Sequence, residues 1–517
     1  MDKLSKLNNN NNNNRLFEDD EFPADSSSIC FYNLPQELSD GGVKWLRPHE
    51  ITKTPFLFVD GTNRRDVKQG ILGDCWFLSA CASVAKKQDL IEKVIDPNQK
   101  LFGEGYKGVL VVKFWRFGDW VSVCIDDRLP TKNGRLIFGS CIDKTEFWLA
   151  MVEKAYAKLH GSYEALVGGH ALEAFVDLTG GIAETIQVSS GDTFNQLKLL
   201  FSHGAFITCS RKGETDHHKD CRKHILSSNG LIEGHAYSVT CVTTIKLLNK
   251  NFVELIRLRN PWGDAVEWDG AWSDRSSEWD NVSDEEKKKL KLLAKDDGEF
   301  WMGFNHFKKE FEEITVATIG PDFDQDGLPD VPLEVSTIKS CWKKGINAGG
   351  SRNDPEKFSL NPQYLLHLKE SCWSKEGNEC SSVLVGLMQE HRRSEKNKRL
   401  AMIPIGFFIY KTDTPFERLG PEYFLCMPEE SSSGDFTNRR EVIVRTNLKP
   451  GYYVIIPATF FPDTETNFMI RVFSLQPFIL KEITNENDDE FTRKLPEVPE
   501  NNNNNFNTGF SYDDFHR

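Results

Sequence analysis

The chain has 517 residues, of which 39% are hydrophobic, and this length predicts about three domains with buried cores. Its formal net charge of −14 argues against nucleic acid as a bulk partner and suits a protein that binds cations. The 12 cysteines are spread singly, which is typical of free thiols in a reducing compartment rather than of a disulfide framework. The sequence shows no secretory signal pattern and no apolar run of about 20 residues, so we expect a soluble, cytoplasmic protein.

Low-complexity composition marks both ends of the sequence. Residues 1–28 carry an asparagine tract and an acidic, serine-rich stretch, and residues 481–517 carry acids, prolines and a second asparagine tract. Such segments bury too little apolar surface to offset the entropy lost when a chain becomes ordered. We therefore expect both segments, 1–28 and 481–517, to be disordered tails.

The run QGILGDCWF at residues 69–77 predicts a nucleophile. Cys75 follows a Gly-Asp turn and opens an apolar run of small residues, which indicates a buried helix with the cysteine in its first turn. The positive end of a helix dipole favours the thiolate. The side-chain amide of Gln69 and a backbone N–H would form the donor pair of an oxyanion hole. A buried structural cysteine is the alternative interpretation.

The elements that follow separate a nucleophile lobe from a base lobe. Apolar runs predict a hairpin of strands at 108–115 and 120–127, and helical spacing predicts a helix at 147–159. Gly180-Gly181 marks an expected hinge. Strand-like runs then appear around 206–208, 236–242 and 252–258.

A histidine and an asparagine flank these last two strands. His235 precedes the first and Asn260 ends the second. A cysteine nucleophile needs a base and the base needs an orienting group, and Cys, His, Asn is the papain-type order. One imidazole nitrogen would pair with Cys75, the other would donate to the Asn260 carbonyl, and Trp262 would shield that second bond from water.

Residues 335–480 differ in character from the rest. Short alternating apolar runs separated by turns predict an antiparallel β-sandwich. The runs lie at 364–368, 382–387, 405–410, 452–457 and 468–473.

Three motifs together closely resemble the calpains, the calcium-dependent intracellular cysteine proteases: QGILGDCW at 69–76, GHAYSV at 234–239 and RNPWG at 259–263. The resemblance runs from about residue 30 to about residue 480. It implies an α+β fold, with a two-lobed papain-like protease core and then a C2-like β-sandwich. The expected parts are a first lobe at 29–181, a second lobe at 182–320, a linker at 321–334 and the β-sandwich at 335–480.

The resemblance also implies two calcium sites in the protease core, built from the oxygen ligands that calcium prefers. The first would use the carbonyls of Val59 and Gly61 with Asp66 and Glu146. The second would use the carbonyl of Lys295 with Glu267, Asp274, Asp297 and Glu299. Calcium in both sites would let the lobes close and the triad assemble. Acids solvated in loops are the alternative.

Three other patterns are interpreted as decoys. The run Asp322 to Gly327 begins like an EF-hand loop, but Leu333 stands where a glutamate is needed, so we expect an acidic linker. The crowded group of His217, His218, Cys221 and His224 is expected to be a surface loop rather than a zinc site. The basic stretch at 390–399 is expected to be a solvated loop, with attraction to anionic lipid as the alternative.

The sequence therefore predicts a calcium-activated cysteine endopeptidase that makes limited cuts in protein substrates. A catalytically silent calcium- and membrane-binding module is the alternative, and transglutaminase-like acyl transfer is a third class that Asn260 disfavours. The sequence shows no penta-EF-hand domain, so a small EF-hand subunit is not an expected partner. The acidic loop of the family's β-sandwich is missing at 371–381, which puts calcium or lipid control through this domain in doubt.

Overall fold

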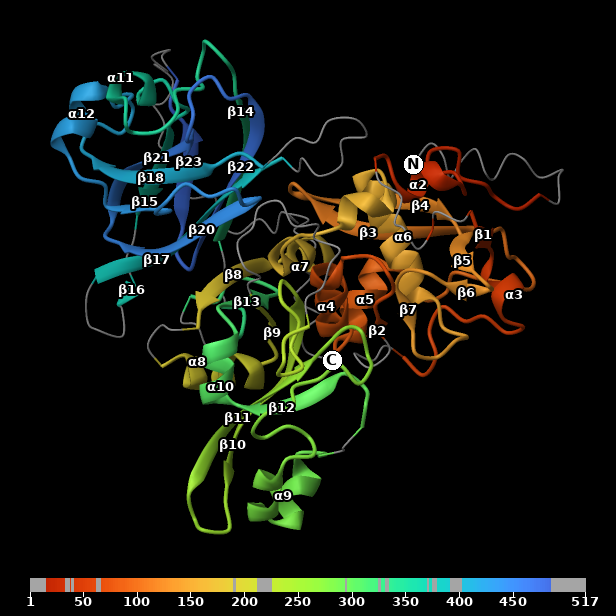
Figure 1. Ribbon diagram of the computed structural model, residues 1–517. Helices are drawn as coiled ribbons and strands as arrows, with labels where there is room; N and C mark the ends of the chain where they lie inside the picture. The colour runs from red at the N-terminus through yellow and green to blue at the C-terminus, as the bar shows by residue number, and fades with distance from the viewer. Residues whose placement is uncertain are drawn as a thin grey trace.

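The computed structural model of the chain has an α+β fold with three sheet-containing parts (Figure 1). It describes residues 15–32, 38, 41–61, 67–188, 192–211, 226–292, 295–323, 327–330, 334–369, 372–373, 379–390 and 402–484. In Figure 1 the β-sandwich lies beside the first lobe, and the long sheet of the second lobe extends below both. Within the described residues, no helix has the length and apolar character needed to cross a membrane.

The first lobe is built around α4 (Cys75–Val84), whose residues are all buried. A helix that is apolar on every side belongs inside a core. It packs against α7 (Ala171–Thr179), and α6 (Trp148–His160) supports the neighbouring β3–β4 hairpin. The remaining elements of this lobe are α2 (Ser26–Ile29), β1 (Val43–Leu46), α3 (Pro48–Ile51), β2 (Val67–Lys68), α5 (Gln88–Val94), β3 (Val109–Arg116), β4 (Asp119–Asp126), β5 (Leu129–Lys132), β6 (Arg135–Leu136), β7 (Ser140–Cys141) and η3 (Tyr163–Leu166).

The second lobe is a six-stranded antiparallel sheet with the order β12-β11-β10-β9-β13-β8. The elements of this lobe are β8 (Ile182–Gln187), α8 (Thr193–Ser202), β9 (Phe206–Ser210), β10 (Ala236–Lys246), β11 (Phe252–Arg259), η4 (Ser277–Asn281), α9 (Asp284–Lys289), β12 (Glu299–Gly303), α10 (Phe304–Glu310) and β13 (Glu313–Thr318). Strand β10 packs against α4, and Ala236 at its start belongs to the first hydrophobic core. The two lobes are therefore in contact at the helix that carries Cys75.

The C-terminal part forms two facing sheets, which confirms the predicted antiparallel β-sandwich. One sheet has the order β14-β22-β17-β16 with β20 paired to β17, and the other has the order β19-β18-β21-β15-β23. The elements are β14 (Glu334–Trp342), α11 (Pro355–Phe358), β15 (Tyr364–Leu368), β16 (Cys372–Trp373), β17 (Glu379–Gln389), β18 (Ile405–Thr412), α12 (Pro421–Cys426), β19 (Ser431–Ser432), β20 (Glu441–Leu448), β21 (Gly451–Thr459), β22 (Thr466–Ser474) and β23 (Phe478–Glu482). The apolar runs predicted from sequence lie in β15, β17, β18, β21 and β22.

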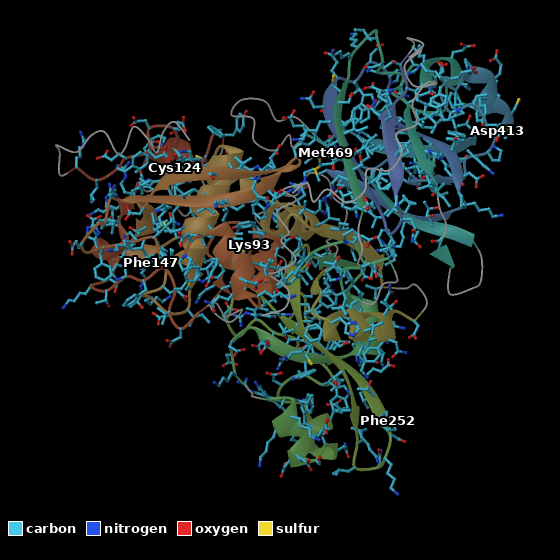
Figure 2. All side chains as sticks on the ribbon, turned by 180° about the vertical axis from the view of Figure 1, so that it is seen from behind. Lys93, Cys124, Phe147, Phe252, Asp413 and Met469 are labelled. Atoms are coloured by element: carbon cyan, nitrogen blue, oxygen red, sulfur yellow. The ribbon has the colours of Figure 1, made fainter. Side chains whose placement is uncertain are left out.

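The β-sandwich also contributes to the core of the first lobe. Met388 and Met469 are buried there among residues of that lobe. Figure 2 labels Met469 at the junction of the two parts, and the turn of the β3–β4 hairpin at Gly118 lies against it. This shared packing places the β-sandwich directly against the first lobe.

The prediction of a disordered N-terminal tail is wrong for residues 15–28. Phe22 is 1% exposed and its ring lies 6.0 Å from that of Tyr163. The carboxylate of Asp19 pairs with Lys158 at 2.6 Å, and the backbone N–H of Asp19 donates to Asp126. One aromatic anchor and a largely buried ion pair order a segment whose composition resembles that of a solvated chain. Residues 1–14 and 485–517 lie outside the described residues, and the other predicted domain boundaries stay predictions.

Candidate active site

Cys75 is the first residue of α4 and is almost fully buried. The backbone N–H of Ala236, the first residue of β10, lies near the thiol and acts to lower its pKa. A hydrogen bond joins the same helix and strand, because the Ser238 hydroxyl donates to the Ser79 carbonyl at 3.0 Å. The fold therefore places the thiol beside the residue that follows His235.

His235 and Asn260 form a buried pair at the start of β10 and the end of β11. His235 Nε2 lies 2.8 Å from Asn260 Oδ1, and both residues are 0% exposed. The amide of Asn260 is held from its other side, because Nδ2 donates to the Val266 carbonyl at 3.0 Å. Nε2 is thus committed to Asn260, which leaves Nδ1 as the ring nitrogen for exchanging a proton with a thiol.

Trp262 lies against this pair. Its ring meets the His235 ring edge-on, with the ring centroids 5.5 Å apart. Its backbone N–H donates to Asn260 Oδ1 at 3.0 Å, so this oxygen accepts hydrogen bonds from both His235 and Trp262. Two donors on one amide oxygen fix the orientation of Asn260 and, through it, of the imidazole.

The protonation of Cys75 is controlled by burial. Burial raises the pKa of the Cys75 thiol to about 12, against the opposing effect of the Ala236 N–H and with a contribution from the Asp74 carboxylate. Burial therefore outweighs the helix-terminus effect expected from the sequence. A buried thiol of this kind is neutral near pH 7 and needs an adjacent base to become a nucleophile.

Gln69 is buried close to the turn that leads into α4. Its Nε2 donates to the Leu72 carbonyl at 2.6 Å. A primary amide carries two N–H donors, so this bond uses one of them and leaves the other for an oxyanion. The N–H of Cys75 is among the first N–H groups of α4, which have no partner within the helix. These are the two donors predicted for the oxyanion hole.

Two hydrogen bonds join the lobes directly at the site. The backbone N–H of Gln69 donates to the Pro261 carbonyl at 2.8 Å. Arg259, which is buried, donates to the Val67 carbonyl at 3.2 Å and to the Asp297 carbonyl at 3.0 Å. Sequence reasoning did not single out Arg259, although an arginine at the end of an apolar strand run was a visible signal.

The residues predicted for the first calcium site are only partly described. The buried carboxylate of Glu146 accepts the backbone N–H of Val59 at 3.0 Å, which brings these two residues together. Gly61, two residues after Val59, has a left-handed backbone conformation with a φ of 84°. Asp66 lies outside the described residues.

Three of the residues predicted for the second calcium site, Glu267, Asp274 and Lys295, help to line a pocket of about 570 Å³. Burial raises the pKa of Glu267 to about 7 and that of Asp274 to about 6, and repulsion from neighbouring acids that include Asp297 adds to both shifts. Crowded carboxylates that resist ionisation suit a hard cation with oxygen ligands.

The side chains of these acids interact with other groups of the protein. Glu267 accepts the N–H of Gly298 at 2.8 Å and Asp274 accepts that of Trp301 at 3.2 Å, while Glu299 faces Arg257 at 3.6 Å. Across the described residues, no three acidic, histidine or cysteine side chains already form a metal-binding set. The donor chemistry fits calcium, and binding requires these side chains to turn toward one another.

The decoy patterns lie mostly outside the described residues. These include the His217, His218, Cys221 and His224 group and nearly all of the basic stretch at 390–399. In the EF-hand-like run, the carboxylate of Asp322 accepts the N–H of Gly327 at 2.7 Å, while residues 324–326 are not described. Their interpretation stays a prediction.

A cysteine at the start of a buried helix and a histidine–asparagine pair at the adjacent strands of a second lobe are the residue set of papain-type cysteine peptidases. The family model of the calpain family cysteine proteases matches residues 17–318, and that of domain III of the calpain large subunit matches residues 338–473. The chain therefore belongs to the calpain family of cysteine proteases.

Curated relatives agree with this family. Calpain-A of Drosophila melanogaster is 41% identical over 479 residues, covering 90% of this chain and 56% of that protein. Human Calpain-9 is 41% identical over 471 residues, covering 90% and 66%, and the Calpain-1 catalytic subunit of Rattus norvegicus is 39% identical over 499 residues, covering 93% and 67%. The chain thus spans about half to two thirds of the length of these relatives. Among solved structures, the clostridial cysteine protease Cwp84 matches over 60% of this chain and 59% of that chain with a TM-score of 0.15 and 9% identity, which is too distant to bear on the fold.

Proposed function

We propose that this chain is a calcium-activated cysteine endopeptidase that makes limited cuts in cytoplasmic proteins. The buried 2.8 Å contact between His235 and Asn260, one residue from the N–H that lies near the Cys75 thiol, is the observation that carries the proposal. None of the nine cysteines whose side chains the structure describes belongs to a disulfide, which supports a reducing compartment.

The reaction begins with proton transfer from the Cys75 thiol to Nδ1 of His235. The sulfur then attacks the scissile carbonyl carbon, and the new oxyanion is held by the N–H groups of Gln69 and Cys75. The C–N bond breaks as His235 gives its proton to the leaving amine. Water then loses a proton to His235 and attacks the thioester, so that the C–S bond breaks and the thiol is restored.

Asn260 and Trp262 contribute without touching the substrate. Asn260 keeps the imidazole in the orientation and tautomer that direct Nδ1 toward the thiol. Trp262 covers the His235–Asn260 bond, and a dry bond is stronger than one that competes with water. Both effects stabilise the imidazolium that forms during the reaction.

Calcium is proposed as the activator. Glu267, Asp274, Asp297 and Glu299 with the Lys295 carbonyl would hold one ion, and Val59, Gly61, Asp66 and Glu146 would hold another. Bound calcium would supply positive charge that relieves the repulsion among these acids. Because Arg259 joins the Asp297 segment to the lobe interface, ordering that segment would stabilise the closed arrangement. The ion activates only if it binds that arrangement more tightly.

The test is hydrolysis of casein, titrated with calcium, by the wild type, by Cys75→Ala and by Cys426→Ala, an exposed thiol on α12 that serves as the matched control. We expect cleavage only with calcium, in the wild type and the control but not in Cys75→Ala. Cleavage that ignores calcium would overturn the two sites as activators. Calcium binding without any cleavage would favour the catalytically silent, membrane-binding alternative, which vesicle binding by the same protein would then test.

A further inference from the structure

Asp74 directly precedes the nucleophile, and its side chain does not cap the helix that begins there. It is the N-cap residue of α4, where an aspartate ordinarily accepts an N–H from the first turn, but its side chain makes no such bond. It is 0% exposed, and among the described residues neither of its carboxyl oxygens accepts a hydrogen bond from an N–H group or a hydroxyl. An isolated carboxylate in such a place is very costly to bury.

The group that faces Asp74 is another carboxyl, that of Glu153 on α6. Glu153 is 1% exposed, and the two side chains are hydrogen-bonded to each other. Two carboxylates can only accept, so a bond between them requires a proton on one of the four oxygens. The carboxyl oxygens of Glu153 also accept the backbone N–H of Gly139 at 3.0 and 2.9 Å.

The surroundings of this pair keep the proton in place. Among the described residues, the ionisable side chains of Cys81 on α4 and Tyr163 on η3 interact with both carboxyls, and that of Cys75 interacts with Asp74. None of these three side chains carries a positive charge. Burial raises the pKa of Asp74 to about 7, and burial together with the charge of Asp74 holds the pKa of Glu153 well above its usual range. Like-charge pairs in one site cannot both ionise near neutral pH.

Gly139 connects the pair to the oxyanion side of the site. The N–H of Ile71 donates to the Ile137 carbonyl at 3.0 Å, so the Gln69 loop rests on the segment that Glu153 holds. A side chain at Gly70 would place its Cβ 2.2 Å from that same carbonyl oxygen, so the two segments touch backbone to backbone. Glu153 therefore reaches the nucleophile turn through Asp74 and the oxyanion loop through Gly139.

We propose that Asp74 and Glu153 share one proton and act as a positioning pair, fixing the Cys75 turn against the oxyanion loop and limiting the pair to one negative charge beside the thiol. This role in catalysis depends on the proposed peptidase function. The pair itself touches neither substrate nor reacting atoms. Its effect reaches the reaction through the ionisation of Cys75, which the charge of Asp74 opposes.

Two isosteric variants separate this role from simple support. Asp74→Asn removes the carboxylate whose charge opposes ionisation of the Cys75 thiol, so the pKa of Cys75 should fall by roughly one pH unit. Glu153→Gln still donates to Asp74 and still accepts from Gly139 but has no proton to share. The charge then localises on Asp74, and the pKa of Cys75 should rise by a comparable amount.

The measurement is the pH dependence of Cys75 alkylation by iodoacetamide, followed by mass spectrometry of the Cys75 peptide. Glu164→Gln is the matched control, because the Glu164 carboxyl also accepts backbone N–H groups in the first lobe, those of Phe31 and Tyr32. Shifts of opposite sign support the pair, and shifts of the same sign, or none, overturn it. The readout needs no hydrolysis, so inactivity toward casein would count against the proposed function and not against the pair.

Folding of the variants is checked by circular dichroism. If only one variant folds, the direction in which its Cys75 pKa shifts supports or overturns the proposal. If neither folds, the infrared spectrum of the wild type near neutral pH, recorded with saturating calcium, should show the carbonyl stretch of a buried protonated carboxyl. Its absence overturns the shared proton.

Discussion

Arg440 of the β-sandwich donates to Asp177 of α7 at 2.7 Å, and both side chains are almost completely buried. Asp177 also accepts from Arg116 at 3.1 Å and from the hydroxyl of Tyr156 at 2.8 Å. Because α7 packs against α4, this contact connects the β-sandwich to the helix that begins with Cys75. A carboxylate with three donors offsets the cost of burying its charge.

Breaking this ion pair should destabilise the junction. Asp177→Ala leaves the Arg440 guanidinium buried without its carboxylate, at a cost of about 3–5 kcal/mol. We expect a clearly lower thermal unfolding midpoint by calorimetry. Lys289→Met, which removes surface pairs with Glu285 and Glu286 on α9, is the control and should change stability by less than about 1 kcal/mol. Equal midpoints for the two variants would show that the junction contributes little.

Asn260→Ala should slow the reaction more than it weakens substrate binding. The substitution removes the acceptor of His235 Nε2 and of the Trp262 N–H, so the imidazole loses its fixed orientation. We expect kcat to fall by roughly 10²-fold or more, with little change in KM. Asn195→Ala on α8 is the control, because among the described residues its side chain bonds locally to Asp192. A change confined to KM would contradict the orienting role.

Calcium should matter more for stability as the pH rises. The unfolded chain releases the protons of Glu267 and Asp274 near their usual pKa values of about 4. The folded protein holds them until about pH 7 and about pH 6, respectively, so folding without calcium loses stability as the pH rises through that window.

The measurement is the unfolding midpoint between pH 5 and pH 8 with calcium and with a chelator. The stabilisation by calcium should grow with pH, because protons and calcium compete for the same oxygens. Glu267→Gln should reduce this growth and also flatten the decline seen in the chelator. A calcium effect that is independent of pH would mean that the ion binds elsewhere.

Phe22 should anchor the N-terminal segment. The ring is 1% exposed in the core of the first lobe, so Phe22→Ala should cost about 3–5 kcal/mol. Tyr32→Ala is the control, since its side chain is 52% exposed and should contribute within about 0.5 kcal/mol. The readout is limited proteolysis at residues 15–32 together with the unfolding midpoint. Comparable protease resistance of wild type and Phe22→Ala would contradict the anchoring role.

The fold could largely be predicted from local pattern. Alternating apolar residues predicted β15, β17, β18, β21 and β22, because a strand in a sandwich buries one face and needs a period of two. The run after Cys75 predicted α4, since small apolar residues on every side suit only a buried helix. The N-terminal segment was mispredicted, because one phenylalanine and a few charges decide its order through partners more than 100 residues away.

By itself, the sequence determined the chemical types at the site: a thiol after a Gly-Asp turn, an imidazole before one strand and an amide after the next. These depend on short-range order along the chain. Only the tertiary structure decided the protonation of Cys75, the pairing of Asp74 with Glu153 and the buried ion pair between Arg440 and Asp177. Burial depth and charge separation set those properties, and both depend on which distant segments the fold brings together.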